Sequence, residues 1–273
     1  GQLMFFQKLL ALLTAALISV FIGLALLTVD LSTPFQGLGI SSTGLSLHVT
    51  DKGLARQEIE ASILATPDYA KYFARLREAF TSDYEAVLND FAALRAETGE
   101  KQSVDYYLSE TVRRIRQKHG ALAAAAENGP LTDVFTSQLN VLRALAVADK
   151  KMCVAFLYGV TNADFQSFAA SRRELVSEMA LAGLEAMLNG RAKNVLRDKP
   201  SDTDFRVLEV ALGDHGLSKA EIDALLDGKI ADPPIEDARM CAAGQTYLDV
   251  LATLPEVARM RIYALAVQLM ASS

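Results

Sequence analysis

The sequence predicts an all-α protein in which a single N-terminal transmembrane helix precedes a globular bundle of about nine helices. Two observations support this fold class. An uncharged apolar run occupies residues 9–29, and from Asp51 onward apolar residues recur at helical spacing between recognisable helix starts and ends. Beyond residue 51, no segment shows convincing alternation of apolar and polar residues.

The apolar run reads LLALLTAALISVFIGLALLTV and contains 21 residues without a charge. As a helix it would span roughly 30 Å, which is the thickness of the hydrocarbon core of a bilayer. The run is longer than the apolar region of a cleaved secretory signal, and its end lacks a good A-x-A cleavage site. We therefore expect residues 1–29 to form an uncleaved signal-anchor.

The charges that flank the run predict its orientation. Lys8 precedes it, Asp30 follows it, and the next positive residue is Lys52. The positive-inside rule places the N-terminus in the cytoplasm and the rest of the chain outside. The Ala- and Leu-rich composition suggests a bacterial protein, which would be a single-pass inner-membrane protein with a periplasmic C-terminal domain.

Residues 30–51 are rich in Gly, Ser and Thr and carry no charge between their terminal aspartates. This composition is typical of a linker that leads away from the bilayer. The stretch GLSLHVT at 44–50 alternates apolar and polar residues, which is compatible with a short strand. Without a partner strand it would be only marginally stable.

Residues 52–273 are expected to form an all-helical soluble domain. Most of its helix starts are marked by a residue that can cap or open a helix. The expected starts, in chain order, are Asp51, Pro67, the capping box Ser82–Glu85, Ser103, Thr132, Asn162, Ser201, the capping box Ser218–Glu221 and Pro255. Thr132 and Asn162 are expected to begin two long helices, which reach to about residues 158 and 189.

The strongest internal break is Asn128-Gly129-Pro130. It could separate a smaller bundle over 52–127 from a larger one over 131–273, or it could be a tight turn within one domain. We favour the turn, because few residues are available for a linker. No repeat of fixed period is present.

The chain has two cysteines, Cys153 and Cys241, 88 positions apart. In an oxidising periplasm this pair is suited to one structural disulfide between two helices. Two separate buried thiols are the alternative. A metal site is disfavoured because there is no C-x-x-C motif and no histidine within seven residues of either cysteine.

Composition and motifs exclude several function classes. A net charge of −6 argues against a nucleic-acid partner. HExxH, GxSxG, P-loop and GxGxxG motifs are absent, so no catalytic residue, metal or cofactor is assigned. If a carboxylate had to be chosen for hydrolysis it would be Glu127, although a surface acid before a turn is the simpler interpretation. The basic stretches 113–118 and 191–199 are interpreted as solvated faces, or as lipid contacts if the domain were cytoplasmic.

Tyrosines are concentrated between residues 69 and 107. Most of them are expected in the core because of their helical spacing, but adjacent residues such as Tyr106 and Tyr107 cannot face the same way. An exposed aromatic patch here would suggest a partner groove. The candidate partner surface consists of Tyr69, Tyr72, Tyr84, Tyr106 and Tyr107.

An anchor and a linker would hold the domain near the bilayer, and the domain shows no recognisable catalytic motif. These features together predict an interaction function. We expect a membrane-anchored periplasmic scaffold, assembly factor or accessory subunit, which contacts the bilayer through residues 9–29 and other membrane or envelope proteins through its helical domain. A membrane-tethered hydrolase is one alternative, for which a deep pocket with two carboxylates would be evidence. A helical ligand-binding or sensor domain is the other, and an apolar cavity between helices would favour it.

Overall fold

The structure is a computed structural model that describes residues 43–272, and all of the regular secondary structure in this range is helical. The all-α class is therefore confirmed for these residues. They form twelve α-helices and one 3₁₀ helix: α2 (Thr43–Leu64), α3 (Pro67–Ala79), α4 (Thr81–Thr98), α5 (Val104–His119), η2 (Gly120–Ala125), α6 (Asn128–Ala148), α7 (Lys150–Leu157), α8 (Ala163–Ser171), α9 (Arg173–Lys193), α10 (Asp202–Asp214), α11 (Lys219–Asp227), α12 (Asp237–Thr253) and α13 (Glu256–Ala271).

The expected anchor over residues 9–29, its orientation and most of the linker lie outside the described residues. Between residues 43 and 272, no helix combines the length and the apolar character that crossing a membrane requires. Helix α2 begins at Thr43, so residues 44–50 are helical and the short strand considered for them is wrong. The helix continues without a break through Asp51, which therefore does not cap its start.

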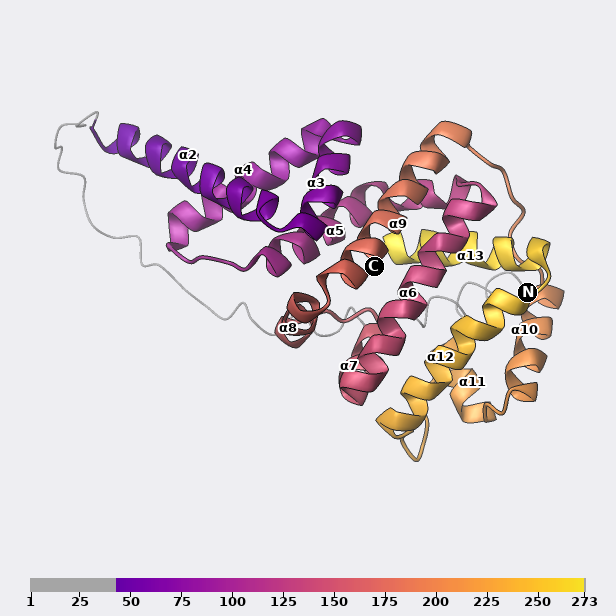
Figure 1. Cartoon of the computed structure of the whole chain (residues 1–273). Coiled ribbons are helices and arrows are strands. Elements are labelled where there is room, and N and C mark those ends of the chain that lie inside the picture. The colour runs from indigo at the N-terminus through magenta and orange to yellow at the C-terminus, as the bar shows by residue number, and fades with distance from the viewer. Residues whose placement is uncertain (1–42, 273) are drawn as a thin grey trace, which may run out of the picture.

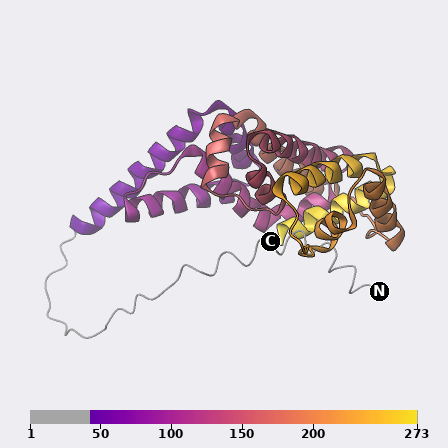
Figure 2. The same cartoon turned by 90° about the horizontal axis from the view of Figure 1, so that it is seen from below.

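Helices α2 and α4 lie side by side and project from the rest of the molecule as an arm (Figures 1 and 2). Charged side chains connect the two helices along their length: Arg56 pairs with Glu85, and Arg95 pairs with Glu58. Between them the Tyr84 hydroxyl donates a hydrogen bond of 2.7 Å to Glu60. The arm leads through α3 and α5 into the body of the molecule.

The body is arranged around α9, which packs against α3, α6 and η2 (Figure 1). Helix α13 also packs against η2 and against α6, while α12 packs against α7 and α6. One cluster of buried residues extends from Ala55 to Val267 and includes side chains on both sides of the Asn128-Gly129-Pro130 break. Asn128, Gly129 and Pro130 themselves form the first turn of α6, so the expected break lies one to two residues earlier, at Ala126 and Glu127, between η2 and α6. The apolar core continues across this interruption.

Two helices expected to be long are each divided into two. At Asp149 the backbone is extended, and the Asp149 side chain accepts a hydrogen bond of 3.0 Å from the Met152 amide, which starts α7 as a new helix. At Arg172 the backbone again leaves the helical region, and α8 ends where α9 begins. These two breaks account for part of the excess over the expected nine helices.

Most of the expected caps are correct. The side chains of Ser103, Asn162, Ser201 and Ser218 each accept the predicted hydrogen bond from the backbone, and Ser218 forms its capping box with Glu221. Besides Asp51, two predicted starts are wrong. Helix α4 begins at Thr81, with only Phe80 between it and the end of α3, so Ser82 lies within its first turn and makes no capping box. Helix α6 begins at Asn128, ahead of Thr132.

The two cysteines lie at disulfide-bonding distance, with their Cα atoms 5.7 Å apart, and no free cysteine remains in the described chain. Both are fully buried. The pair connects α7 to α12, as the sequence predicted, although α7 is a short separate helix instead of the end of a long one.

A candidate ligand-binding cavity

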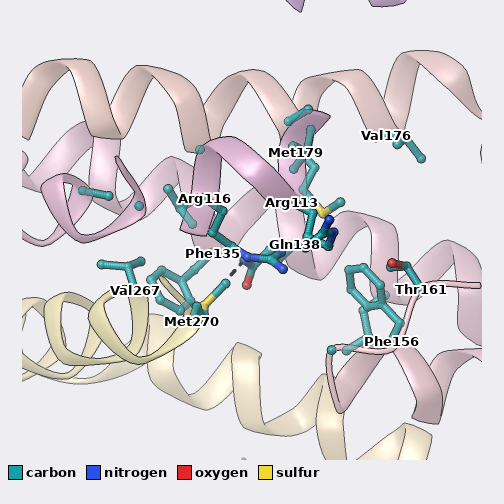
Figure 3. Close-up of a pocket in the computed structure, with 18 of the residues that line it drawn as sticks. Arg113, Arg116, Phe135, Gln138, Phe156, Thr161, Val176, Met179, Val267 and Met270 are labelled. Carbon is teal, nitrogen blue, oxygen red and sulfur yellow. Dashed lines mark hydrogen bonds between the residues drawn. The ribbon is translucent and has the colours of Figure 1, made fainter. Parts of the chain in front are cut away.

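A cavity of about 290 Å³ lies inside the body, between α5, α6, α9, α12 and α13. Its walls are mainly apolar, and Figure 3 shows side chains from several helices that converge on it. Residues from distant parts of the sequence meet there; examples are Phe135 and Leu142 of α6, Phe156 of α7, Met179 of α9 and Val267 of α13. Part of the wall is near solvent, because Gly159 and Thr161 in the loop after α7 are exposed.

One face of α5 contributes both of the charged residues that line the cavity, Arg113 and Arg116. Because residues three and four apart lie on the same side of a helix, Ser109, Val112 and Arg116 follow one another along this face. In Figure 3 the labelled side chains of Arg113, Arg116 and Gln138 gather between Phe135 and Met270 on one side and Phe156 on the other.

The two arginines differ in their partners. Arg113 is half exposed and forms two hydrogen bonds with the carboxylate of Glu110, at 2.5 and 3.1 Å. The Arg116 side chain forms no hydrogen bond or ion pair with any residue in 43–272, and its Nε atom is buried without a partner. Burial lowers the pKa of Arg116, and the nearby charge of Arg113 lowers it further. Arg116 is only partly exposed, and removing a cation from water without a counter-charge is unfavourable, so its missing partner distinguishes it from Arg113.

Other polar groups of the cavity also have weak partners or none. The Gln138 amide reaches only the sulfur of Met270, at 4.0 Å, and a thioether is a weak acceptor. Tyr72 and Tyr247 also line the cavity, and neither hydroxyl makes a hydrogen bond to another described residue. Burial raises the pKa of both tyrosines well above the usual range, so they remain neutral donors. The cavity thus offers several donors and one positive charge on an apolar background.

Of the five tyrosines proposed as a partner surface, Tyr69, Tyr72, Tyr84 and Tyr107 are buried, and Tyr106 is partly exposed. They are buried because α3, α4 and α5 pack their aromatic faces against each other and against α9. The Tyr69 hydroxyl donates a hydrogen bond of 2.5 Å to the buried carboxylate of Asp105. These four side chains therefore do not form an exposed patch.

The other candidates from the sequence lie outside the cavity. Glu127 is the exposed N-cap residue of α6, and its carboxylate accepts a hydrogen bond of 3.0 Å from Asn189. In the described range, no group of three or more His, Cys, Asp or Glu side chains is placed to hold a metal ion.

The basic stretch 113–118 divides between two environments. Arg113, Arg114 and Lys118 pair with acids at the surface, as expected for a solvated face. Arg116 instead lines the cavity, which differs from the solvated face predicted for this stretch. The available signal was its spacing, since Arg116 lies four residues after Val112 and eight after Leu108, both of which belong to the apolar face of α5.

Comparisons with known proteins do not add a relationship. No protein-family model matches the chain, and neither a curated protein nor a solved structure gives a match.

Proposed function

We propose that the helical domain binds a small, largely apolar molecule in the cavity between α5, α6, α9, α12 and α13. The observation that carries the proposal is the cavity itself, which is apolar, lies in the centre of the body and contains polar groups with weak partners or none. Ligand sites in proteins have this composition, with a few polar groups on an apolar wall.

The size of the cavity limits the ligand. A cavity of 290 Å³ is at the lower end of the range for small-molecule sites, which is roughly 300–1,000 Å³. An apolar cavity of about 150 Å³ holds benzene, so this one has room for about a dozen non-hydrogen atoms. A single short chain or a small ring system therefore fits, and a two-chain lipid does not.

The lining favours binding over hydrolysis. Among the residues that line the cavity, none of those described is an Asp, Glu, His or Cys. The two carboxylates that would support a glycosidase-like hydrolase are therefore not found in this site. In the proposal, residues 9–29 anchor the domain to the inner membrane and the cavity faces the periplasm, where amphipathic molecules from the bilayer are within reach.

Filling the cavity tests this function. Gly183 of α9 lines the cavity, and a Cβ atom added there meets no atom within 4 Å. We expect Gly183→Leu to place its side chain in the free space and to abolish the binding of ten-carbon probes, decanoate and decan-1-ol, in isothermal titration calorimetry. Gly213→Leu is the matched control, because Gly213 in α10 has equally open surroundings and does not line the cavity.

The full-length protein purified from membranes should also yield a small apolar molecule on solvent extraction and mass spectrometry. If neither probe binds to the wild-type protein, or if Gly183→Leu binds both probes as well as the wild type does, the proposed function is wrong.

The interaction function expected from the sequence is our second proposal, and the arm formed by α2 and α4 favours it. The arm projects from the body, and Leu54, Leu64 and Leu94 are exposed on it (Figures 1 and 2). Crosslinking and affinity purification from native membranes tests this proposal. A partner that is lost when these leucines are replaced by serine would support it, and recovery of the protein alone would contradict it.

A further inference from the structure

The charges of the side chains around the cavity indicate the charge of its ligand. This inference rests on the proposed ligand-binding function. Arg113 is neutralised by Glu110 at the edge of the cavity. Glu110 also pairs with Arg114, which in turn pairs with Asp90. Arg116 is the remaining cation, and none of the other helices that line the cavity contributes a charged residue to it. The cavity therefore has a surplus of one positive charge.

A guanidinium in an apolar environment is stabilised best by a planar anion. A carboxylate accepts two parallel hydrogen bonds from the same guanidinium, and such charge-assisted bonds are among the strongest in proteins. The Gln138 amide also lines the cavity and offers a neutral donor there. A single surplus charge matches a monoanion and would leave a dianion with one charge unbalanced.

The walls specify the remainder of the ligand. Apart from the polar groups already named, the lining consists of aliphatic, aromatic and thioether side chains together with small residues. An alkyl or aromatic body fits this wall, and the volume holds about a dozen non-hydrogen atoms in total. A fatty acid with a chain of about ten carbons has this size.

We propose that the cavity binds a medium-length carboxylic acid as its anion, with the carboxylate at Arg116 and the apolar body between α6, α9 and α13. Arg116 would then be unpaired only in the empty protein. The ligand supplies the counter-charge that residues 43–272 do not provide.

Three probes of equal chain length test the charge requirement on the wild-type protein: decanoate, decan-1-ol and decylammonium. Calorimetry at pH 7.5 should show that decanoate binds about 10- to 100-fold more tightly than decan-1-ol, as expected for hydrogen bonds between charged groups. Decylammonium should not bind. Because this series needs no variant, its outcome does not depend on the folding of a mutant.

The variant Arg116→Met then tests whether the Arg116 guanidinium binds the carboxylate. Methionine replaces the unbranched part of the arginine side chain and carries no charge, so we expect decanoate binding to fall about 10- to 100-fold while decan-1-ol binding stays the same or improves. Arg114→Met is the control on the same helix, since Arg114 does not line the cavity, and it should leave the binding of both probes unchanged.

The outcomes of these experiments distinguish the carboxylate proposal from the more general proposal that the cavity binds a ligand. Equal binding of decanoate and decan-1-ol to the wild type, or unchanged decanoate binding by Arg116→Met, overturns the carboxylate proposal; the binding function then stands if Gly183→Leu still abolishes binding. If none of the three probes binds to the wild type, the binding function itself fails, and the carboxylate proposal fails with it.

Discussion

Gly190 of α9 lies directly against the main chain of Leu122 in η2. A Cβ atom added to Gly190 would overlap the Leu122 carbonyl oxygen and would lie 2.8 Å from its carbonyl carbon and 3.2 Å from the Ala126 nitrogen. The segment that follows α9 also binds η2: the Val195 amide donates to the Ala125 carbonyl at 2.8 Å, and the Arg197 guanidinium donates to the carbonyls of Ala124 and Ala126. This contact fixes one end of the body.

Gly190→Ala should therefore destabilise the protein. The added Cβ is fixed to the main chain of α9 and clashes with main-chain atoms of Leu122, so no side-chain rotation can relieve the overlap. Overpacking of this kind costs about 1–3 kcal/mol or more. Urea denaturation followed by circular dichroism measures the loss. Gly183→Ala in the same helix is the control, because its Cβ meets open space; it should be neutral or stabilising by up to about 1 kcal/mol. Equal stabilities of the two variants would contradict the close approach.

Asp105 joins the start of α5 to α3 and α9. Its buried carboxylate accepts hydrogen bonds from the Tyr69 hydroxyl at 2.5 Å and from the Arg173 guanidinium at 2.9 and 3.2 Å. Asp105→Ala leaves the Tyr69 hydroxyl buried without an acceptor, so we expect a loss of about 1.5–3 kcal/mol in the free energy of unfolding. Asp90→Ala, which removes an exposed partner of Arg114, should cost less than about 1 kcal/mol. A similar loss in both variants would show that the buried network has no special role.

The Cys153–Cys241 pair closes a loop across a sequence separation of 88. For a loop of this length the chain-entropy model gives an upper figure of about 4–5 kcal/mol. Replacing both cysteines by alanine should lower the urea midpoint correspondingly, and reduction of the wild type should lower it as well. Thiol labelling under denaturing, non-reducing conditions should detect no free cysteine. Labelling of both cysteines would mean that the bond does not form.

Acid should destabilise the fold through Glu110 and Asp83. Burial raises the pKa of Glu110, but hydrogen bonds from Arg113 and Arg114 outweigh this effect and hold the pKa below its usual value of about 4.5. Asp83 is similar: burial raises its pKa, and Lys118 and His119 lower it by more. A carboxyl whose pKa is depressed by folding stabilises the protein above its unfolded pKa, and that contribution is lost as the pH falls through the folded pKa.

Stability should therefore decrease from about pH 4.5 downward, as measured by urea midpoints between pH 7 and pH 3. Glu110→Gln should be less stable at pH 7 and should lose less stability between pH 5 and pH 3. Glu97→Gln, at an exposed position of α4, should follow the wild-type curve. A Glu110→Gln curve parallel to that of the wild type would contradict the assignment.

The sequence by itself determined the helical class, because the spacing of apolar residues and the capping side chains are local properties of the chain. Ser103, Asn162, Ser201 and Ser218 marked helix starts correctly, since a cap involves residues only three positions apart. Cys153 and Cys241 could be paired because the chain has no other cysteine.

Only the tertiary structure decided which residues face the interior together. The sequence pattern is compatible with Asp149 as an interior helical residue, but in the structure its backbone is extended and separates α6 from α7. Arg116 lies in a basic stretch that appeared to be solvated, but its Nε atom is buried, and the side chain lines a cavity that residues of α6, α9 and α13 complete. A cavity has no local signature in the sequence, because it is the space left between side chains that are far apart along the chain.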